Sequence, residues 1–74
     1  MKIQETWSEP QIVESGLERK IRVTLALHGD GWNAQNGVNV LLGPEPDAVL
    51  VATQAAKLLL TEWAGTVVAA HVGN

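Results

Sequence analysis

Few side chains in this sequence could do chemistry. His28 and Asp30 stand close together at the end of an alternating segment, where an imidazole and a carboxylate could face one side as an acid/base pair. With His71 they would also offer nitrogen and oxygen ligands that suit zinc. Their spacing matches no recognised metal or catalytic pattern, and a surface histidine and a turn-forming aspartate explain the same residues. We therefore predict no metal and no cofactor, and place an enzyme using His28 and Asp30 third, below two binding functions.

Motifs for nucleophilic catalysis and phosphate binding are also missing. The chain has no cysteine, and neither Ser8 nor Ser15 has a histidine at a diagnostic spacing. Gly29-Asp30-Gly31 lacks the third glycine of a dinucleotide-binding turn and the lysine of a P-loop. The sequence predicts a protein without catalytic activity of its own.

The charge balance and the N-terminal residues limit the partners. Eight acidic residues against five basic ones give a net charge of -3 and a pI near 5.1, which opposes direct binding to nucleic acid. The N-terminal residues lack the apolar run of a signal peptide. The apolar region from Ala48 to Ala64 is interrupted by polar residues and is too short for a membrane span. We expect a cytoplasmic, intracellular protein that binds neither nucleic acid nor membranes.

The spacing of apolar residues predicts a single α+β domain over residues 1–74. Glu18 to His28 alternates apolar and polar side chains, as in a strand with one buried face. Ile3 to Glu14 supplies an earlier strand, which Pro10 must break, bulge or place at a sheet edge. Ser15-Gly16 marks a tight turn between these two strands.

Two interpretations of the next segment remain open. Gly29-Asp30-Gly31 predicts a reversal, after which Trp32 begins a returning strand. Asn36-Gly37 is either a two-residue hairpin turn that separates two short strands, or a bulge within one irregular strand from Trp32 to Leu42.

A long helix is predicted from Asp47 to Ala64. Pro46 and Asp47 are typical of a helix start, and Gly65 is well placed as the residue after the last turn. Thr66 to Val72 is apolar and β-branched, which predicts a closing strand buried on both faces. The expected fold is a two-layer sandwich, an antiparallel sheet of about three to five strands with one long helix, in the order β-β-(β)-β-α-β.

The predicted helix carries more apolar surface than a small sheet can cover. Its expected core face consists of Val49, Ala52, Ala56, Leu59, Leu60 and Trp63. Val51, Ala55 and Leu58 widen the apolar arc to roughly 200°, whereas covering a sheet takes about 100°. Either a twisted sheet wraps around the helix, or another protein covers the extra flank. We favour another protein, either a second copy of this chain or a different partner, and expect these three residues to bind it.

Tryptophans and glutamates complete the predicted partner surface. Neither Trp7 nor Trp32 fits a clean core pattern, and a satellite position beside the core is the favoured explanation for each. Tryptophan is enriched at binding hot spots, and if one of the two is a partner anchor we choose Trp32. The basic residues cluster in one place: Arg19, Lys20 and Arg22. Glu14 and Glu18 either neutralise this cluster across neighbouring strands or share an outward face as an acidic strip that opposes a nucleic-acid-binding groove on another protein.

The chain resembles two groups of small proteins in the order of its segments, which are Arg22 to His28, Gly29-Asp30-Gly31-Trp32, Asp47 to Trp63 and Val67 to Val72. One group is the phage-encoded anti-CRISPR inhibitors, and the second choice is the sheet-plus-helix domain of HicB-like antitoxins. The likeness covers about residues 18 to 72 in element order and carries over no functional residue. It implies inhibition by stoichiometric binding to a larger nucleoprotein machine.

These observations predict a non-enzymatic protein-binding module that is a homodimer or docks on a larger partner. The specific prediction is a small inhibitor encoded by a phage or mobile element. The alternative is a small homo-oligomeric ligand-binding protein whose pocket lies at the subunit interface.

Overall fold

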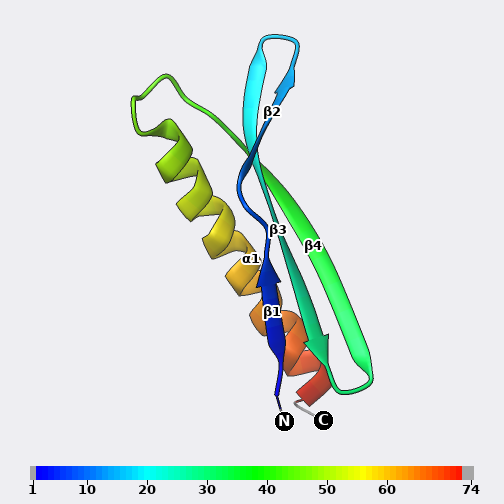
Figure 1. Cartoon of the computed structure of the whole chain (residues 1–74). Helices are drawn as coiled ribbons and strands as arrows, with labels where there is room; N and C mark the ends of the chain where they lie inside the picture. The colour runs from blue at the N-terminus through cyan, green and yellow to red at the C-terminus, as the bar shows by residue number, and fades with distance from the viewer. Residues whose placement is uncertain (1, 73–74) are drawn as a thin grey trace.

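The computed structural model describes residues 2–72, in the order β-β-β-β-α (Figure 1). The elements are β1 (Gln4–Trp7), β2 (Gln11–Ser15), β3 (Glu18–Gly29), β4 (Trp32–Leu41) and α1 (Ala48–Val72). The strands form an antiparallel sheet and α1 lies along one of its faces. The predicted α+β class, with an antiparallel sheet and one long helix, is confirmed.

β3 is the central strand. β4 pairs along one of its edges, in a regular register from Lys20 opposite Leu41 to Gly29 opposite Trp32. β1 and β2 share the other edge, β1 beside the second half of β3 and β2 beside the first half. Pro10 lies between β1 and β2, where no ladder hydrogen bond is required of it. The break that Pro10 predicts is confirmed.

Glycines with positive φ close both hairpins. Gly16, with φ of 62°, is the first residue of the two-residue turn between β2 and β3. Gly31, with φ of 78°, follows Asp30 in the turn between β3 and β4. A side chain at either position would strain the backbone, which is why glycine stands there. Both reversals agree with the sequence prediction.

Asn36-Gly37 lies inside one continuous strand. The register of β4 against β3 runs through it without a bulge, with Gly37 opposite Thr24. On the sheet face away from the helix, a Cβ at Gly37 would lie 2.7 Å from Nη2 of Arg22 and 2.9 Å from Cγ2 of Thr24, so a larger residue would displace these side chains. The single-strand interpretation is therefore right, and both the hairpin turn and the bulge are wrong.

α1 begins where the sequence predicts it and ends later. The carbonyl of Asp47 accepts the N–H of Val51 at 3.0 Å, which makes Asp47 the residue that precedes the first turn. The helix then continues through Gly65 as far as Val72, so the predicted closing strand from Thr66 to Val72 is wrong. Gly65 keeps a negative φ and does not end the helix.

Packing explains why the β-branched segment is helical. A helix of 25 residues is about 37 Å long and a strand of 12 residues about 40 Å, so α1 matches β3 in length. Val67 and Val68 follow the buried Ala64 at helical spacing and pack against the core. These contacts outweigh the local preference of valine and threonine for strands.

The core is one layer of aliphatic side chains between sheet and helix. Its fully buried members are Ile21, Val23, Leu25 and Leu27 of β3 and Ala52, Ala56, Leu60 and Ala64 of α1. The buried helix residues are four positions apart, and each step of four turns about 40° around the axis. The contact line therefore drifts around α1 as the helix crosses a twisted sheet.

This drift corrects the predicted core face of the helix. Ala52, Ala56 and Leu60 are buried as expected. Val49 and Leu59 lie at the flanks of the drifting line and are 43% and 52% exposed, so their assignment to the core is wrong.

The molecule is elongated, with principal extents of 45 × 16 × 15 Å. α1 packs on β3 and β4, and the β2–β3 hairpin projects past the N-terminal end of the helix (Figure 1). The exposed surface is 5221 Å², whereas a compact monomer of this mass exposes about 4,400 Å². α1 does not combine the length and apolarity of a membrane-spanning helix.

Candidate protein-binding surfaces

The buried residues of α1 form one row along the helix, and the remaining residues form parallel rows on either side of it and on its back. The row one position before the buried residues, continued before the partly buried Val68, is apolar. It consists of Val51, Ala55, Leu59, Trp63 and Val67, which we call the β4-side ladder. Its N-terminal end faces β4, because Val51 and Ala55 line a hollow together with Val40. Its C-terminal end also faces β4, because His71, the next residue in the row, stacks on Trp32 at the start of β4. Val51 is 54% exposed and Leu59 52%, while the other three are half-buried.

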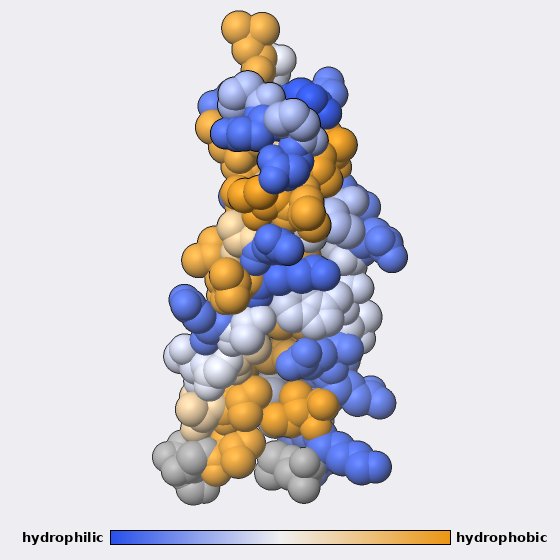
Figure 2. Space-filling model, turned by 90° about the vertical axis from the view of Figure 1, so that its left-hand side faces the viewer, coloured by the Kyte–Doolittle hydropathy of each residue, from blue (hydrophilic) through white to orange (hydrophobic). Residues whose placement is uncertain are grey.

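The other rows are less apolar. The row on the side of β1 and β2 is mostly polar or small: Val49, Thr53, Lys57, Thr61, Gly65 and Ala69. On the back of the helix, Leu50 is 59% exposed and Leu58 68%. Figure 2, which faces the helix side of the molecule, shows apolar atoms in the upper half and again near the lower end, with polar and weakly polar atoms between them. Leu58 thus lies on a different surface from Val51 and Ala55, with which it was grouped.

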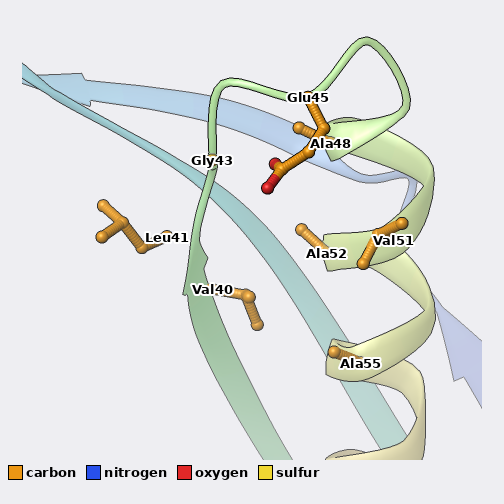
Figure 3. Close-up of a pocket in the computed structure, with 8 residues that line it drawn as sticks. All are labelled: Val40, Leu41, Gly43, Glu45, Ala48, Val51, Ala52 and Ala55. Atoms are coloured by element: carbon orange, nitrogen blue, oxygen red, sulfur yellow. The ribbon is translucent and has the colours of Figure 1, made fainter.

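A hollow of about 280 Å³ opens between the start of α1 and the end of β4 (Figure 3). Its lining is Val40, Leu41, Gly43, Glu45, Ala48, Val51, Ala52 and Ala55. The carboxylate of Glu45 turns back against Gly43, where a Cβ would overlap it. Among these lining side chains Glu45 alone is charged, so the hollow is an apolar surface depression without the several convergent polar groups that orient a small ligand.

Trp32 holds the C-terminal end of α1 to the sheet. Its indole stacks on the His71 ring with centroids 4.2 Å apart and planes 14° from parallel. The ring also lies over Gly29, where any Cβ would overlap it. Trp32 is half-buried and packs against the core. Trp32 therefore lies in the satellite core position that the sequence favours for it.

Trp7 occupies the corresponding place on the opposite edge. It lies opposite Leu25 in the sheet, is half-buried against the core, and donates its Nε1–H to Oε1 of Glu5 at 3.2 Å. Trp7 and Trp32 thus flank the core from the two edges of the sheet. Neither offers a fully exposed indole face to a partner.

The three residues considered for metal or acid/base chemistry do not come together. His28 alternates with the buried Leu27 and so lies on the sheet face away from the helix. His71 is on the helix face, with Nδ1 2.9 Å from the carbonyl of Val67. Within residues 2–72, no three His, Cys, Asp or Glu side chains lie close enough to hold a metal ion.

The β2–β3 hairpin exposes apolar side chains that the sequence analysis did not select. Ile12 is 49% exposed, Val13 41% and Leu17 104%, and we call these three residues the hairpin tip. Ile12 lies opposite Ile21 on the helix-side face, whereas Val13 lies opposite Lys20 on the other face. Leu17 stands in the turn, a position that usually takes Gly, Asn, Asp, Ser or Pro. The hairpin thus exposes apolar side chains on both of its faces and in its turn.

Glu14 and Glu18 surround this tip but do not form one strip. Oε1 of Glu14 lies 3.6 Å from Nε of Arg19, across the strand pair, and Oε1 of Glu18 lies 3.7 Å from Nζ of Lys20. Glu14 is on the helix-side face and Glu18 on the other. Neutralisation across strands is therefore observed for Arg19 alone, Lys20 pairs within its own strand, and Glu14 and Glu18 do not share one face.

The described residues thus define a small α+β protein with one antiparallel sheet and a single long helix. It exposes apolar groups at the hairpin tip and on the β4-side ladder. No family model, curated protein or solved structure matches the chain. The likeness to small inhibitors in element order stays a prediction, and the final strand that formed part of it is helical here.

Of the predicted partner residues, the structure brings Val51 and Ala55 together and leaves the others on separate surfaces. Leu59 and Leu17 are among the exposed residues that the sequence did not assign to a partner surface. The signal for Leu59 was the apolar residue at every fourth position from Val51 to Val67. The signal for Leu17 was a large apolar residue directly after a turn glycine.

Proposed function

We propose that this chain is a protein-binding module without catalytic activity of its own, which acts by occupying a surface of a larger protein complex. The observation that supports the proposal most is the hairpin tip, because Leu17 is fully exposed at the end of a hairpin that projects past the helix. Exposed apolar groups that gather at one place are typical of contact sites for other proteins.

The surroundings of the tip favour a protein partner. Charged side chains of both signs surround the apolar groups, as the Glu14–Arg19 and Glu18–Lys20 pairs show. An apolar centre with a polar rim is the usual composition of a protein interface. Burying one leucine side chain contributes about 1.5–3 kcal/mol, or roughly 10- to 100-fold in affinity.

The finer proposal is a small inhibitor, encoded by a phage or mobile element, that acts inside the cell on a nucleoprotein complex. Its support is the net charge of -3 on a chain of 74 residues, since an acidic protein is attracted to the basic grooves that bind nucleic acid. Such an inhibitor would block by stoichiometric binding. Its effect on the target would therefore saturate at a fixed molar ratio.

The test compares three forms of the chain as affinity baits in a lysate of the native host: the wild type, Leu17→Asp and Gln54→Asp. Gln54 is an exposed helix residue away from the hairpin and serves as the matched control. We expect wild type and Gln54→Asp to retain the same partner in similar amounts. The amount of this partner retained by Leu17→Asp should be at least about tenfold lower. Leu17→Asp should leave the free energy of unfolding within about 0.5 kcal/mol, since the side chain is exposed.

The outcomes separate binding from inhibition. Equal capture by wild type and Leu17→Asp, or no partner for any bait, would refute the proposal. Titration of the chain into the purified partner complex should then lower its activity to a plateau. An unchanged activity would reject the inhibitor while leaving the binding module in place.

The second candidate is a homo-oligomeric ligand-binding protein, in which another copy would supply the polar groups that the hollow of Figure 3 lacks. This hollow opens beside β4, where another copy of the chain could complete its wall. Native mass spectrometry of freshly purified protein would show an added small molecule if this function is right. Val51→Trp, which fills the hollow, should abolish that added mass, and Leu58→Trp on the back of the helix should not.

A further inference from the structure

The two edges of the sheet are protected very differently. The edge made by β1 and β2 is interrupted around Pro10 and carries glutamates, and both features hinder pairing with another strand. β4 is an unbroken strand of 10 residues that contains no proline and no charged residue. Within residues 2–72, no segment pairs with its outer edge. A long, uncharged edge of this kind is a template for a further strand.

Backbone groups along that edge are free to pair. The N–H of Leu42 donates to the carbonyl of Arg19 at 2.8 Å, so even-numbered residues of β4 direct their backbone groups toward β3. Backbone groups therefore point outward at Asn33, Gln35, Gly37, Asn39 and Leu41. The N–H of Gly37 is already bonded to Oδ1 of Asn36 at 2.9 Å, which leaves the other four N–H groups facing solvent.

The β4-side ladder continues this edge without charge. Each of its residues is uncharged, and Val51 and Leu59 are more than half exposed. In a two-fold contact the same surface meets itself, so any charge near the axis would face its own copy. An uncharged edge beside an uncharged apolar ladder avoids this repulsion. Glu45 is the one charged side chain that lines the hollow at the end of this surface, so a different partner that uses charge for selection would find little to recognise here.

We infer that β4 of one copy pairs in antiparallel fashion with β4 of a second copy, about a two-fold axis perpendicular to the sheet. The sheet would then run through both copies, with the two α1 helices side by side on one face. α1 packs on β3 and β4 alike, so its axis lies over that strand pair. Strands are about 4.8 Å apart, which places the two helix axes about 10 Å apart, the usual spacing of packed helices.

The pairing would also reduce the exposed area. The chain exposes 5221 Å², about 800 Å² more than a compact monomer of its mass. Joining two copies along β4 would bury both ladders and the outer edge of each sheet. This contact uses the edge of the sheet opposite the one that carries the hairpin tip. An experiment can therefore contradict the dimer without contradicting the proposed partner binding, and the reverse.

Light scattering of the full chain at about 100 µM tests the inference. A micromolar dissociation constant, about -8 kcal/mol, would make the chain mostly dimeric there. We expect a mass of twice 7.9 kDa for wild type and for Gln54→Asp. Leu59→Asp should give the monomer mass, because it places a charge on each facing ladder. Gln35→Pro should do the same, because it removes an outward N–H without removing a bond to β3.

A measurement in folded protein decides the outcome if a variant is unstable. The chain has no cysteine, so Asn39→Cys and Glu14→Cys each provide one site for a spin label. We expect a shorter distance between copies for labels at Asn39, on β4, than for labels at Glu14, on the opposite edge. A wild-type monomer, or a dimer in which the Glu14 labels are the closer pair, would overturn the inference.

Discussion

Three consecutive leucines show how sharply the environment changes from one residue to the next on α1. Leu58 is 68% exposed on the back of the helix, Leu59 is 52% exposed on the β4-side ladder, and Leu60 is fully buried against the sheet. Each step turns the side chain by about 100°, so neighbours in sequence face different surroundings. Side-chain type alone could not distinguish them.

These leucines provide a prediction at the residue scale. Leu60→Ala should lower the free energy of unfolding by about 2–5 kcal/mol, because it leaves a cavity in the core. Leu58→Ala should change it by about 0.5 kcal/mol or less, because the side chain touches solvent. Urea unfolding of both variants at one protein concentration measures the difference. Equal losses for the two variants would contradict the position of the core on α1.

At the scale of elements, α1 is the point where local signals and packing disagree. Gly65 and the β-branched residues after it predict a helix end followed by a strand. The observed helix passes through Gly65 because Ala64, Val67 and Val68 continue the row of contacts on the sheet. A glycine in a helix interior then only weakens the helix.

Gly65→Ala tests this helix directly. The added Cβ meets nothing within 4 Å, and φ is not positive, so we expect the free energy of unfolding to rise by about 0.5–1 kcal/mol. The matched control is Gly16→Ala, which also has open space but a φ of 62°. That substitution should cost about 1–2 kcal/mol, since alanine is strained there. A loss of stability for Gly65→Ala would indicate that the helix ends at this residue.

For the whole molecule, the elongated shape predicts uneven stability. The centre of β3 is paired on both sides and covered by α1, whereas β2 is paired on one side and lies beyond the helix. Segments with few buried contacts open without unfolding the rest of a protein.

Hydrogen exchange should reveal this difference. We expect the amide of Val13 in β2 to exchange through local opening, at least about tenfold faster than that of Val23 in β3, after correction for intrinsic rates. Both amides point toward a neighbouring strand and are hydrogen-bonded within the sheet. The difference in their exchange rates therefore reports on burial and not on hydrogen bonding. Equal protection of Val13 and Val23 would mean that the hairpin opens only when the whole chain unfolds.

Much of the fold could be predicted because its signals are local. Alternation along Glu18 to His28, the break at Pro10, the turn glycines and the start of the helix each depend on a few neighbouring residues, and each agrees with the structure. Asn36-Gly37 did not follow its local preference, because pairing with β3 holds it in a strand. Of the residues predicted to bind a partner, Val51 and Ala55 lie together on the β4-side ladder, while Trp32 packs within the chain.

Composition, turn chemistry and apolar periodicity were sufficient to predict a small acidic α+β chain with one long helix. Tertiary packing decided three further features: how far the helix runs, which of its apolar rows meets the sheet, and which sheet edge stays open. The reason is that these features arise from contacts between α1, β3 and β4, whose residues lie far apart in the chain. The angle at which a helix crosses a twisted sheet is set by all of these contacts together, and no short stretch of sequence encodes it.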